Sequence, residues 1–186
     1  MKARALFLDR DGVINHEVGY LHRSEEVRFV EGIFLLCRAA RSLGYKLVVV
    51  TNQSGIARGF YSTEQFEQLM SWFRVQFERE QAPLDAVYHC PFHPDHGVGE
   101  FRREHEDRKP GPGMLLRAAR HLDLDLERSI LIGDRCSDIA AANAAGLRQA
   151  FLLAGTEAGT ETTTCPGDYQ LIDSLAQALR WIKAAG

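Results

Sequence analysis

Short apolar segments that alternate with amphipathic ones constrain the fold of this chain more than any other feature of its sequence. Each apolar segment is too short for a buried helix and ends at polar residues. These segments lie at residues 5–8, 46–50, 85–89, 129–133 and 148–153. Mostly apolar runs of this length are typical of parallel strands that are covered on both faces.

The segments between these strands have helical periodicity. They lie at residues 31–44, 62–80, 111–122, 137–146 and 173–185. Ser62 or Thr63 is expected to cap the second helix, and Ser137 the fourth. Strands that alternate with helices predict an α/β fold, with a doubly wound, Rossmann-like parallel sheet and helices on both faces.

Length and composition fit one domain over residues 1–186, and 45% hydrophobic residues are enough for a sizeable core. The net charge of −3 provides no basic stripe for nucleic acid. No apolar run reaches the roughly 18 residues that span a bilayer, and no signal peptide is recognisable. The four cysteines form no C-x-x-C pair. We therefore expect a reduced, cytoplasmic protein without nucleic-acid or membrane partners.

Polar residues follow each predicted strand. They are Asp9 and Asp11 after the first, Thr51 and Asn52 after the second, Arg108 and Lys109 in the loop after the third, and Asp134 and Asp138 after the fourth. Ligands of such sheets bind beyond the carboxyl ends of the strands, so these groups should converge. Carboxylates without clustered His or Cys favour Mg²⁺, and a hydroxyl with a lysine suits a phosphate.

Asp9 and Asp11 lie two residues apart, so in an extended segment their side chains point the same way. Two carboxylates this close repel each other unless a cation lies near them. Asp9 could be a nucleophile that forms an aspartyl phosphate, and Asp11 a general acid and base. This division of labour requires a raised pKa for Asp11 and an ionised Asp9.

Each of these motifs is weak alone, because an aspartate pair after a strand usually belongs to a turn. Their occurrence together and in order is specific. No dinucleotide-binding glycine motif follows the first strand, and no P-loop or serine nucleophile elbow is present. A non-catalytic phosphate-binding protein would not need both Asp9 and Asp11. Two loops, 12–25 and 90–110, are long enough to be functional or disordered.

Four stretches resemble, in order, the motifs of the haloacid dehalogenase superfamily of phosphatases. They read FLDRDGVIN, VVVTNQSGIARG, RKPGPGM and IGDRCSDIAAANAAG. The resemblance covers residues 5–153 and implies a Rossmann-like fold with no large cap domain. It implies that 12–25 is a flap over the site and that 90–110 is a specificity loop.

The resemblance implies a phosphomonoester hydrolase with Asp9 as the nucleophile and Asp11 as the acid and base. Mg²⁺ would be held by the Asp9 side chain, the Asp11 backbone carbonyl and Asp134. Asp138 would support these metal ligands from behind.

The phosphate would be bound by Thr51, Asn52 and Lys109, and Arg108 would contact a sugar. The stretches LDRDGVIN and TNQSGIARG are most similar to phosphatases of a heptose bisphosphate in lipopolysaccharide inner-core biosynthesis, with histidinol-phosphatases as a sister group. The expected partner is therefore a small phosphorylated sugar. The alternative is histidinol phosphate, and we expect a monomer.

The resemblance also implies a structural zinc in the loop 90–110, but the sequence departs from the usual ligand set. The matching positions are Cys90, Phe92, His105 and Asp107. Phe92 cannot bind a metal, and zinc prefers four Cys or His ligands. We therefore expect packing and ion pairs, rather than zinc, to hold this loop.

Overall fold

A computed structural model describes residues 2–154 and 164–185. In this part of the chain, six parallel strands form one sheet in the order β3-β2-β1-β4-β5-β6. The strands are β1 (Arg4–Leu8), β2 (Tyr45–Asn52), β3 (Ala86–Cys90), β4 (Ile130–Gly133), β5 (Gln149–Leu153) and β6 (Gln170–Ile172). The five predicted strands are confirmed. The sequence did not predict β6, because two of its three residues are exposed and give no apolar run.

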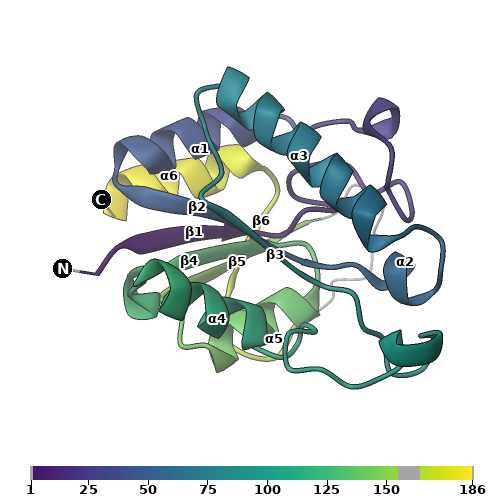
Figure 1. The fold of residues 1–186 in the computed structure, drawn as a ribbon. Helices are drawn as coiled ribbons and strands as arrows, with labels where there is room; N and C mark the ends of the chain where they lie inside the picture. Colours follow the sequence, from purple (N-terminus) through teal and green to yellow (C-terminus); the bar gives the residue numbers. More distant parts are fainter. Residues whose placement is uncertain (1, 155–163, 186) are drawn as a thin grey trace.

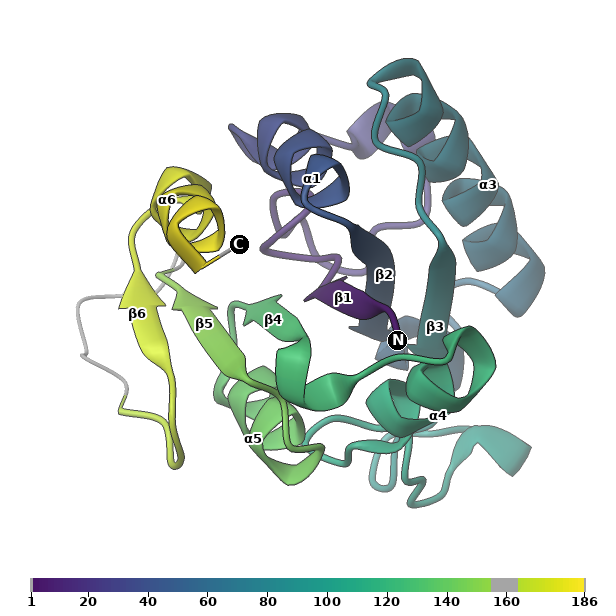
Figure 2. The same cartoon turned by 90° about the vertical axis from the view of Figure 1, so that its left-hand side faces the viewer.

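Helices cover both faces of the sheet, as predicted (Figures 1 and 2). They are α1 (Ile33–Ser42), α2 (Ser54–Ala57), α3 (Thr63–Arg79), α4 (Gly113–Leu122), α5 (Cys136–Ala144) and α6 (Leu175–Ala185), with single 3₁₀ turns at Ser24–Glu26, Gly99–Phe101 and Leu126–Arg128. α1, α3 and α6 lie on one face, and α4 and α5 lie on the other.

Alternating side chains of each strand enter two separate cores. In β1, Leu6 and Leu8 join the core under α1, α3 and α6, whereas Ala5 and Phe7 join the core under α4 and α5. All four are fully buried. β1 is therefore a central strand, and the residue that follows it is held rigidly at the sheet edge.

The helix ends follow local sequence signals. The Ser62 hydroxyl accepts a hydrogen bond from the Gln65 N–H at 3.2 Å, and the Gln65 side chain accepts one from the Ser62 N–H at 2.9 Å, so the predicted cap of α3 is confirmed. The expected Ser137 cap of α5 is wrong. α5 begins one residue earlier, because Asp138 accepts a hydrogen bond from the Arg135 N–H at 3.1 Å.

The chain passes from β1 outward to β2 and β3, and then returns to the other side of β1 to form β4. The strand order reverses between β1 and β4, and a crevice opens at the carboxyl ends of strands at such a point. Asp9 follows β1 directly, and Asp134 follows β4 directly. The fold thus brings residues 125 positions apart into one place.

Candidate active site

Three carboxylates meet at this switch point. Asp9, Asp134 and Asp138 each place one oxygen so that all three oxygens lie within 4.8 Å of one another. Asp9 and Asp138 are buried, and Asp134 Oδ1 is buried without a hydrogen-bond partner in residues 2–154 and 164–185. A cluster of hard oxygen atoms with an unpaired member fits Mg²⁺.

Lys109 is the buried cation of the cluster. Its Nζ lies 3.0 Å from Asp9 Oδ1 and 2.5 Å from Asp138 Oδ1, and it donates a hydrogen bond to the Val50 carbonyl at 3.0 Å. Burial lowers the pKa of Lys109, but Asp138 and Asp9 outweigh that effect and raise the pKa above its usual value. Lys109 is therefore a permanent positive charge beside the expected nucleophile.

The carboxylates of this cluster hold protons strongly. Burial, together with the charges of Asp138 and Asp134, raises the pKa of Asp9 to about 8 against the opposing charge of Lys109. Burial and Asp138 raise the pKa of Asp134 to about 6. A divalent cation among these oxygens would favour their ionised forms, which is how the site could supply an ionised Asp9 at neutral pH.

Asp11 is held differently from Asp9. Its carboxylate accepts hydrogen bonds from Arg10 Nε at 3.0 Å and Arg10 Nη2 at 2.8 Å, from Asn15 Nδ2 at 3.0 Å and from Gln53 Nε2 at 3.1 Å. Burial favours the neutral acid, but the Arg10 charge and these hydrogen bonds lower the pKa of Asp11.

The expected order of the two pKa values is therefore wrong for the arrangement in the structure, in which Asp9 has the raised pKa and Asp11 the lowered one. The physical reason is Arg10, whose side chain is only 1% exposed and forms an ion pair with the Asp11 carboxylate. Sequence reasoning assigned no role to Arg10, because an arginine in a loop is usually solvated.

The phosphate-binding candidates lie together at the ends of β2 and the loop 90–110. Thr51 is buried and accepts a hydrogen bond from Gln53 Nε2 at 2.8 Å. Asn52 Nδ2 donates a hydrogen bond to the Lys109 backbone carbonyl, and Asn52 Oδ1 accepts one from the Lys109 N–H, each at 3.0 Å. Its side chain therefore positions Lys109. Gln53, which the sequence analysis missed, joins Thr51 to Asp11 through its side chain, and the Tyr61 hydroxyl donates a hydrogen bond to Gln53 Oε1 at 2.5 Å.

These groups line one open cavity of about 500 Å³. The stretch 12–25 contributes Glu17, Gly19 and Tyr20 to the lining, and the loop 90–110 contributes His93, Arg108 and Lys109. Glu17 pairs at 3.2 Å with Arg135, which also lines the cavity. Both long loops thus reach the cavity, as expected of functional segments.

In the loop 90–110, the four residues at the positions of the implied zinc ligands make other contacts. Phe92 stacks on His105 with ring centroids 4.6 Å apart, and Asp107 pairs with Arg117 of α4 at 2.8 Å. Cys90 is buried, with its sulfur 3.9 Å from the Phe92 carbonyl oxygen. In the described ranges, these residues do not form a cluster of three metal-ligating groups.

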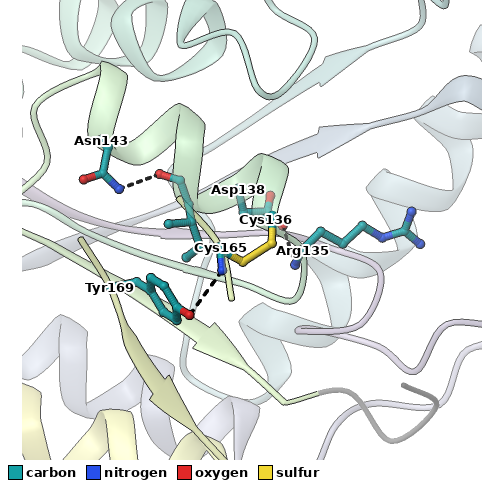
Figure 3. Close-up of a disulfide and its surroundings, with 7 residues drawn as sticks. Arg135, Cys136, Asp138, Asn143, Cys165 and Tyr169 are labelled. Atoms are coloured by element: carbon teal, nitrogen blue, oxygen red, sulfur yellow. Dashed lines mark hydrogen bonds between the residues drawn. A yellow bond between two sulfur atoms is a disulfide. The ribbon is translucent and has the colours of Figure 1, made fainter. Parts of the chain in front are cut away.

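A disulfide involves a cysteine of the segment that carries Asp134 and Asp138. Cys136, between Asp134 and Asp138 in sequence, is bonded to Cys165, whose N–H donates to the Tyr169 hydroxyl at 3.3 Å (Figure 3). The expectation of reduced cysteines is therefore wrong for this pair. No sequence pattern predicted this bond, because the two cysteines are 29 positions apart and only the fold brings them together. Cys37 and Cys90 are free and buried.

Known proteins are similar to this chain in sequence and in fold. A family model described as HAD-hydrolase-like matches residues 107–178. A D-glycero-alpha-D-manno-heptose-1,7-bisphosphate 7-phosphatase of Burkholderia mallei is 50% identical over 163 residues, which make up 88% of this chain and 86% of that protein. A D-glycero-beta-D-manno-heptose-1,7-bisphosphate 7-phosphatase of Escherichia coli K12 is 40% identical over 179 residues, 96% of this chain and 93% of that protein.

Among solved structures, D,D-heptose 1,7-bisphosphate phosphatase from B. bronchiseptica, complexed with magnesium and phosphate, superposes with a TM-score of 0.83. It is 26% identical and covers 98% of this chain and 99% of its own. Fold, site and relatives together define a HAD-like phosphomonoester hydrolase. Within that class, the chain belongs to the family of D-glycero-D-manno-heptose-1,7-bisphosphate 7-phosphatases. None of the described helices has the length and apolar character that a membrane crossing requires.

Proposed function

We propose that this protein removes the 7-phosphate of D-glycero-D-manno-heptose 1,7-bisphosphate, a step toward the lipopolysaccharide inner core. The observation that carries the proposal is the cluster of Asp9, Lys109, Asp134 and Asp138, of which Asp9 and Lys109 line one cavity together with Asp11. The names of the relatives support a heptose bisphosphate and do not favour histidinol phosphate, the alternative from the sequence.

In the first half of the reaction, an Asp9 oxygen attacks the phosphorus and forms an aspartyl phosphate. The oxygen that leaves with the sugar takes a proton from Asp11. Arg10 keeps Asp11 ionised in the free enzyme. The negative charge of an incoming phosphate raises the pKa of a neighbouring carboxyl, so Asp11 takes up a proton from solvent as the substrate binds and holds it for the leaving oxygen. Thr51 and Lys109 hold the phosphate oxygens.

In the second half, Asp11 takes a proton from a water molecule, whose oxygen attacks the phosphorus of the aspartyl phosphate. Phosphate leaves and the Asp9 carboxylate is restored. Asp9, Asp134 and the backbone carbonyl of Asp11 would hold Mg²⁺, with Asp138 behind them, and the bound ion would neutralise charge on the transferring group. Lys109 supplies the remaining positive charge.

The test compares kcat/KM for heptose 1,7-bisphosphate, in both anomers, with that for histidinol phosphate. Both anomers are needed, because relatives named for each of them match this chain. We expect one heptose anomer to be the best substrate and acid quenching to trap a phosphate on Asp9. A higher kcat/KM for histidinol phosphate would contradict the proposed substrate.

We also propose that the enzyme acts as a cytoplasmic monomer and that its loop 90–110 requires no zinc. Asp9, Asp11, Thr51 and Lys109 of one chain line the same cavity, which supports a monomer. A phosphorylated sugar carries charges that are costly to move through a bilayer, so the enzyme must meet it in the compartment where it is made. Light scattering during gel filtration tests the oligomeric state.

A further inference from the structure

Asp11 is held mainly by its own loop. Three of the hydrogen bonds that its carboxylate accepts come from Arg10 and Asn15, which are one and four positions away in sequence. In the described part of the chain, the only donor to this carboxylate from another segment is Gln53 Nε2, at 3.1 Å. Gln53 directly follows β2, so this contact fixes Asp11 relative to the strand end that carries Thr51.

Gln53 also determines the direction of the Thr51 hydroxyl. The amide nitrogen of Gln53 has two hydrogens, and it donates a second hydrogen bond to Thr51 Oγ1 at 2.8 Å. Because Thr51 Oγ1 accepts this bond, its own hydrogen points away from Gln53. A phosphate oxygen is a hydrogen-bond acceptor, so the Thr51 hydroxyl is prepared to donate to it. One amide group therefore orients two groups of the site.

Tyr61 holds the Gln53 side chain in this position. Its hydroxyl donates a hydrogen bond to Gln53 Oε1 at 2.5 Å, so the amide has partners at both of its ends. Both residues are buried, with Gln53 1% and Tyr61 5% exposed. Burial raises the pKa of Tyr61 to about 12, so the hydroxyl keeps its proton at neutral pH and remains a donor.

The ring of Tyr61 is itself placed by two neighbours. A Cβ atom at Gly55 of α2 would lie 2.2 Å from Tyr61 Cε1, so the glycine allows the ring to approach the helix backbone this closely. His22, from the stretch 12–25, stacks on the ring with centroids 5.4 Å apart. Tyr61 also directly precedes Ser62, which caps α3. Tyr61 is therefore a rigid support for Gln53.

We propose that Tyr61 and Gln53 are positioning residues for the phosphatase reaction. Tyr61 fixes the Gln53 amide, which in turn orients the Asp11 carboxylate toward the leaving oxygen and the Thr51 hydroxyl toward the phosphate. Neither Tyr61 nor Gln53 needs to touch the substrate. The inference rests on the proposed function, in which Asp11 is the acid and base. A general acid must lie within hydrogen-bond reach of the leaving oxygen, so a small displacement of Asp11 slows the proton transfer.

The experiment compares kcat/KM on two aryl esters, phenyl phosphate and 4-nitrophenyl phosphate. Phenolate is the poorer leaving group of the two, so its departure depends more strongly on a proton from Asp11. The variants are Tyr61→Phe, Gln53→Met and the double variant Tyr61→Phe/Gln53→Met. The methionine has a similar length to glutamine and removes the hydrogen-bonding amide without adding a charge. Thermal melting confirms that each variant is folded.

Tyr45→Phe is the matched control for the loss of a buried tyrosine hydroxyl. Tyr45 begins β2 and is 3% exposed, similar to Tyr61. Its hydroxyl has no hydrogen-bond partner within residues 2–154 and 164–185. Tyr45→Phe keeps the ring, over which the Arg4 guanidinium lies at 4.2 Å. This variant should therefore have the kcat/KM of the unmodified enzyme on both esters.

We expect Tyr61→Phe and Gln53→Met each to lower kcat/KM on phenyl phosphate roughly tenfold more than on 4-nitrophenyl phosphate. The double variant should lose no more than Gln53→Met alone, because Tyr61 acts through Gln53. Equal losses on the two esters, unchanged kcat/KM in Gln53→Met, or losses that add in the double variant would overturn the proposal.

Asp11→Asn separates failure of this inference from failure of the proposed function. If Asp11 is the acid, its loss should also lower kcat/KM more on phenyl phosphate than on 4-nitrophenyl phosphate. That difference in Asp11→Asn, with equal losses on both esters in Tyr61→Phe, would refute the positioning role alone. Equal losses on both esters in Asp11→Asn would refute its role as the acid, and the inference with it. Poor turnover of heptose 1,7-bisphosphate would refute only the proposed substrate.

Discussion

At the scale of single residues, Arg10 and Asp11 show how one buried pair sets the chemistry of the site. Arg10 is almost fully buried, and two of its nitrogens bind the Asp11 carboxylate. The sequence placed Asp11 at the site because of its spacing from Asp9. The sequence could not predict the lowered pKa of Asp11, because this pKa depends on the orientation of the Arg10 side chain.

We expect Asp11→Asn to lower kcat by about 10²–10⁴, since the general acid and base is lost. The buried Arg10 also loses its partner, so the free energy of unfolding should fall by about 3 kcal/mol or more. Mg²⁺ should still bind, because the proposed ligand at this position is the backbone carbonyl. Isothermal titration with Mg²⁺ and chemical denaturation check these points, and loss of Mg²⁺ binding in a folded variant would show that the side chain is a ligand.

Gly12 sets the distance between the first loop and the metal site. A Cβ atom at this position would lie 2.1 Å from Asp134 Oδ2, and its φ of +87° is unfavourable for other residues. We expect Gly12→Ala to displace Asp134 and weaken Mg²⁺ binding at least roughly tenfold in isothermal titration.

The matched control is Gly44→Ala, which has a similar φ of +83° and open space around its Cβ position. Gly44→Ala should cost stability through its backbone and leave Mg²⁺ affinity as it is. If both variants lost Mg²⁺ affinity equally, the collision with Asp134 would not be the cause.

At the scale of elements, apolar runs predicted the five long strands, and the fold class followed from their alternation with helices. β6 was not predicted, because only Ile172 of its three residues is buried and the strand has no apolar run. The polar residues after β1, β2 and β4 were predicted to converge, and they do. Arg10, Gln53 and Tyr61 were missed, because their roles arise from contacts between loops rather than from spacing in the sequence.

The loop 90–110 gives a prediction about metal content. Because Phe92 stacks on His105 and Asp107 pairs with Arg117, the loop has contacts that replace a metal centre. Exhaustive chelation followed by addition of Mg²⁺ should therefore restore the original melting temperature and activity. One equivalent of bound zinc by elemental analysis, with unfolding on its removal, would show that the loop is a zinc site.

At the scale of the whole molecule, the carboxylate cluster couples stability to pH. Unfolded aspartates lose their protons near their ordinary pKa of 3.8, whereas Asp9 in the folded protein holds its proton up to about pH 8 and Asp134 up to about pH 6. Between these values the unfolded state binds fewer protons, so stability falls as pH rises.

We therefore expect the melting temperature in EDTA to fall as pH rises from about 4 to 8. Mg²⁺ binds the deprotonated cluster, so the stabilisation that it gives should grow over the same range. Calorimetric scans with EDTA and with Mg²⁺ check both trends. A stabilisation by Mg²⁺ that is equal at pH 5 and pH 8 would count against a carboxylate metal site.

The disulfide predicts a second dependence of stability on solution conditions. Cys136 and Cys165 are 29 residues apart, and a crosslink of this span contributes about 3–4 kcal/mol by restricting the unfolded chain. Denaturation of Cys136→Ser/Cys165→Ser should show a loss of this size. Cys37→Ala removes a buried free cysteine and controls for thiol loss alone. Four titratable thiols in the denatured, unreduced protein would contradict the bond.

The same disulfide changes what a cut in the polypeptide would do. A peptide bond broken between Asp138 and Cys165 yields two pieces, one with β1 to β4 and the carboxylate cluster, the other with β6 and α6. Because the two cysteines lie on opposite sides of the cut, the pieces stay covalently joined. α6 also packs against α1 and closes one core. A nicked enzyme would thus remain one molecule until a reductant separates it.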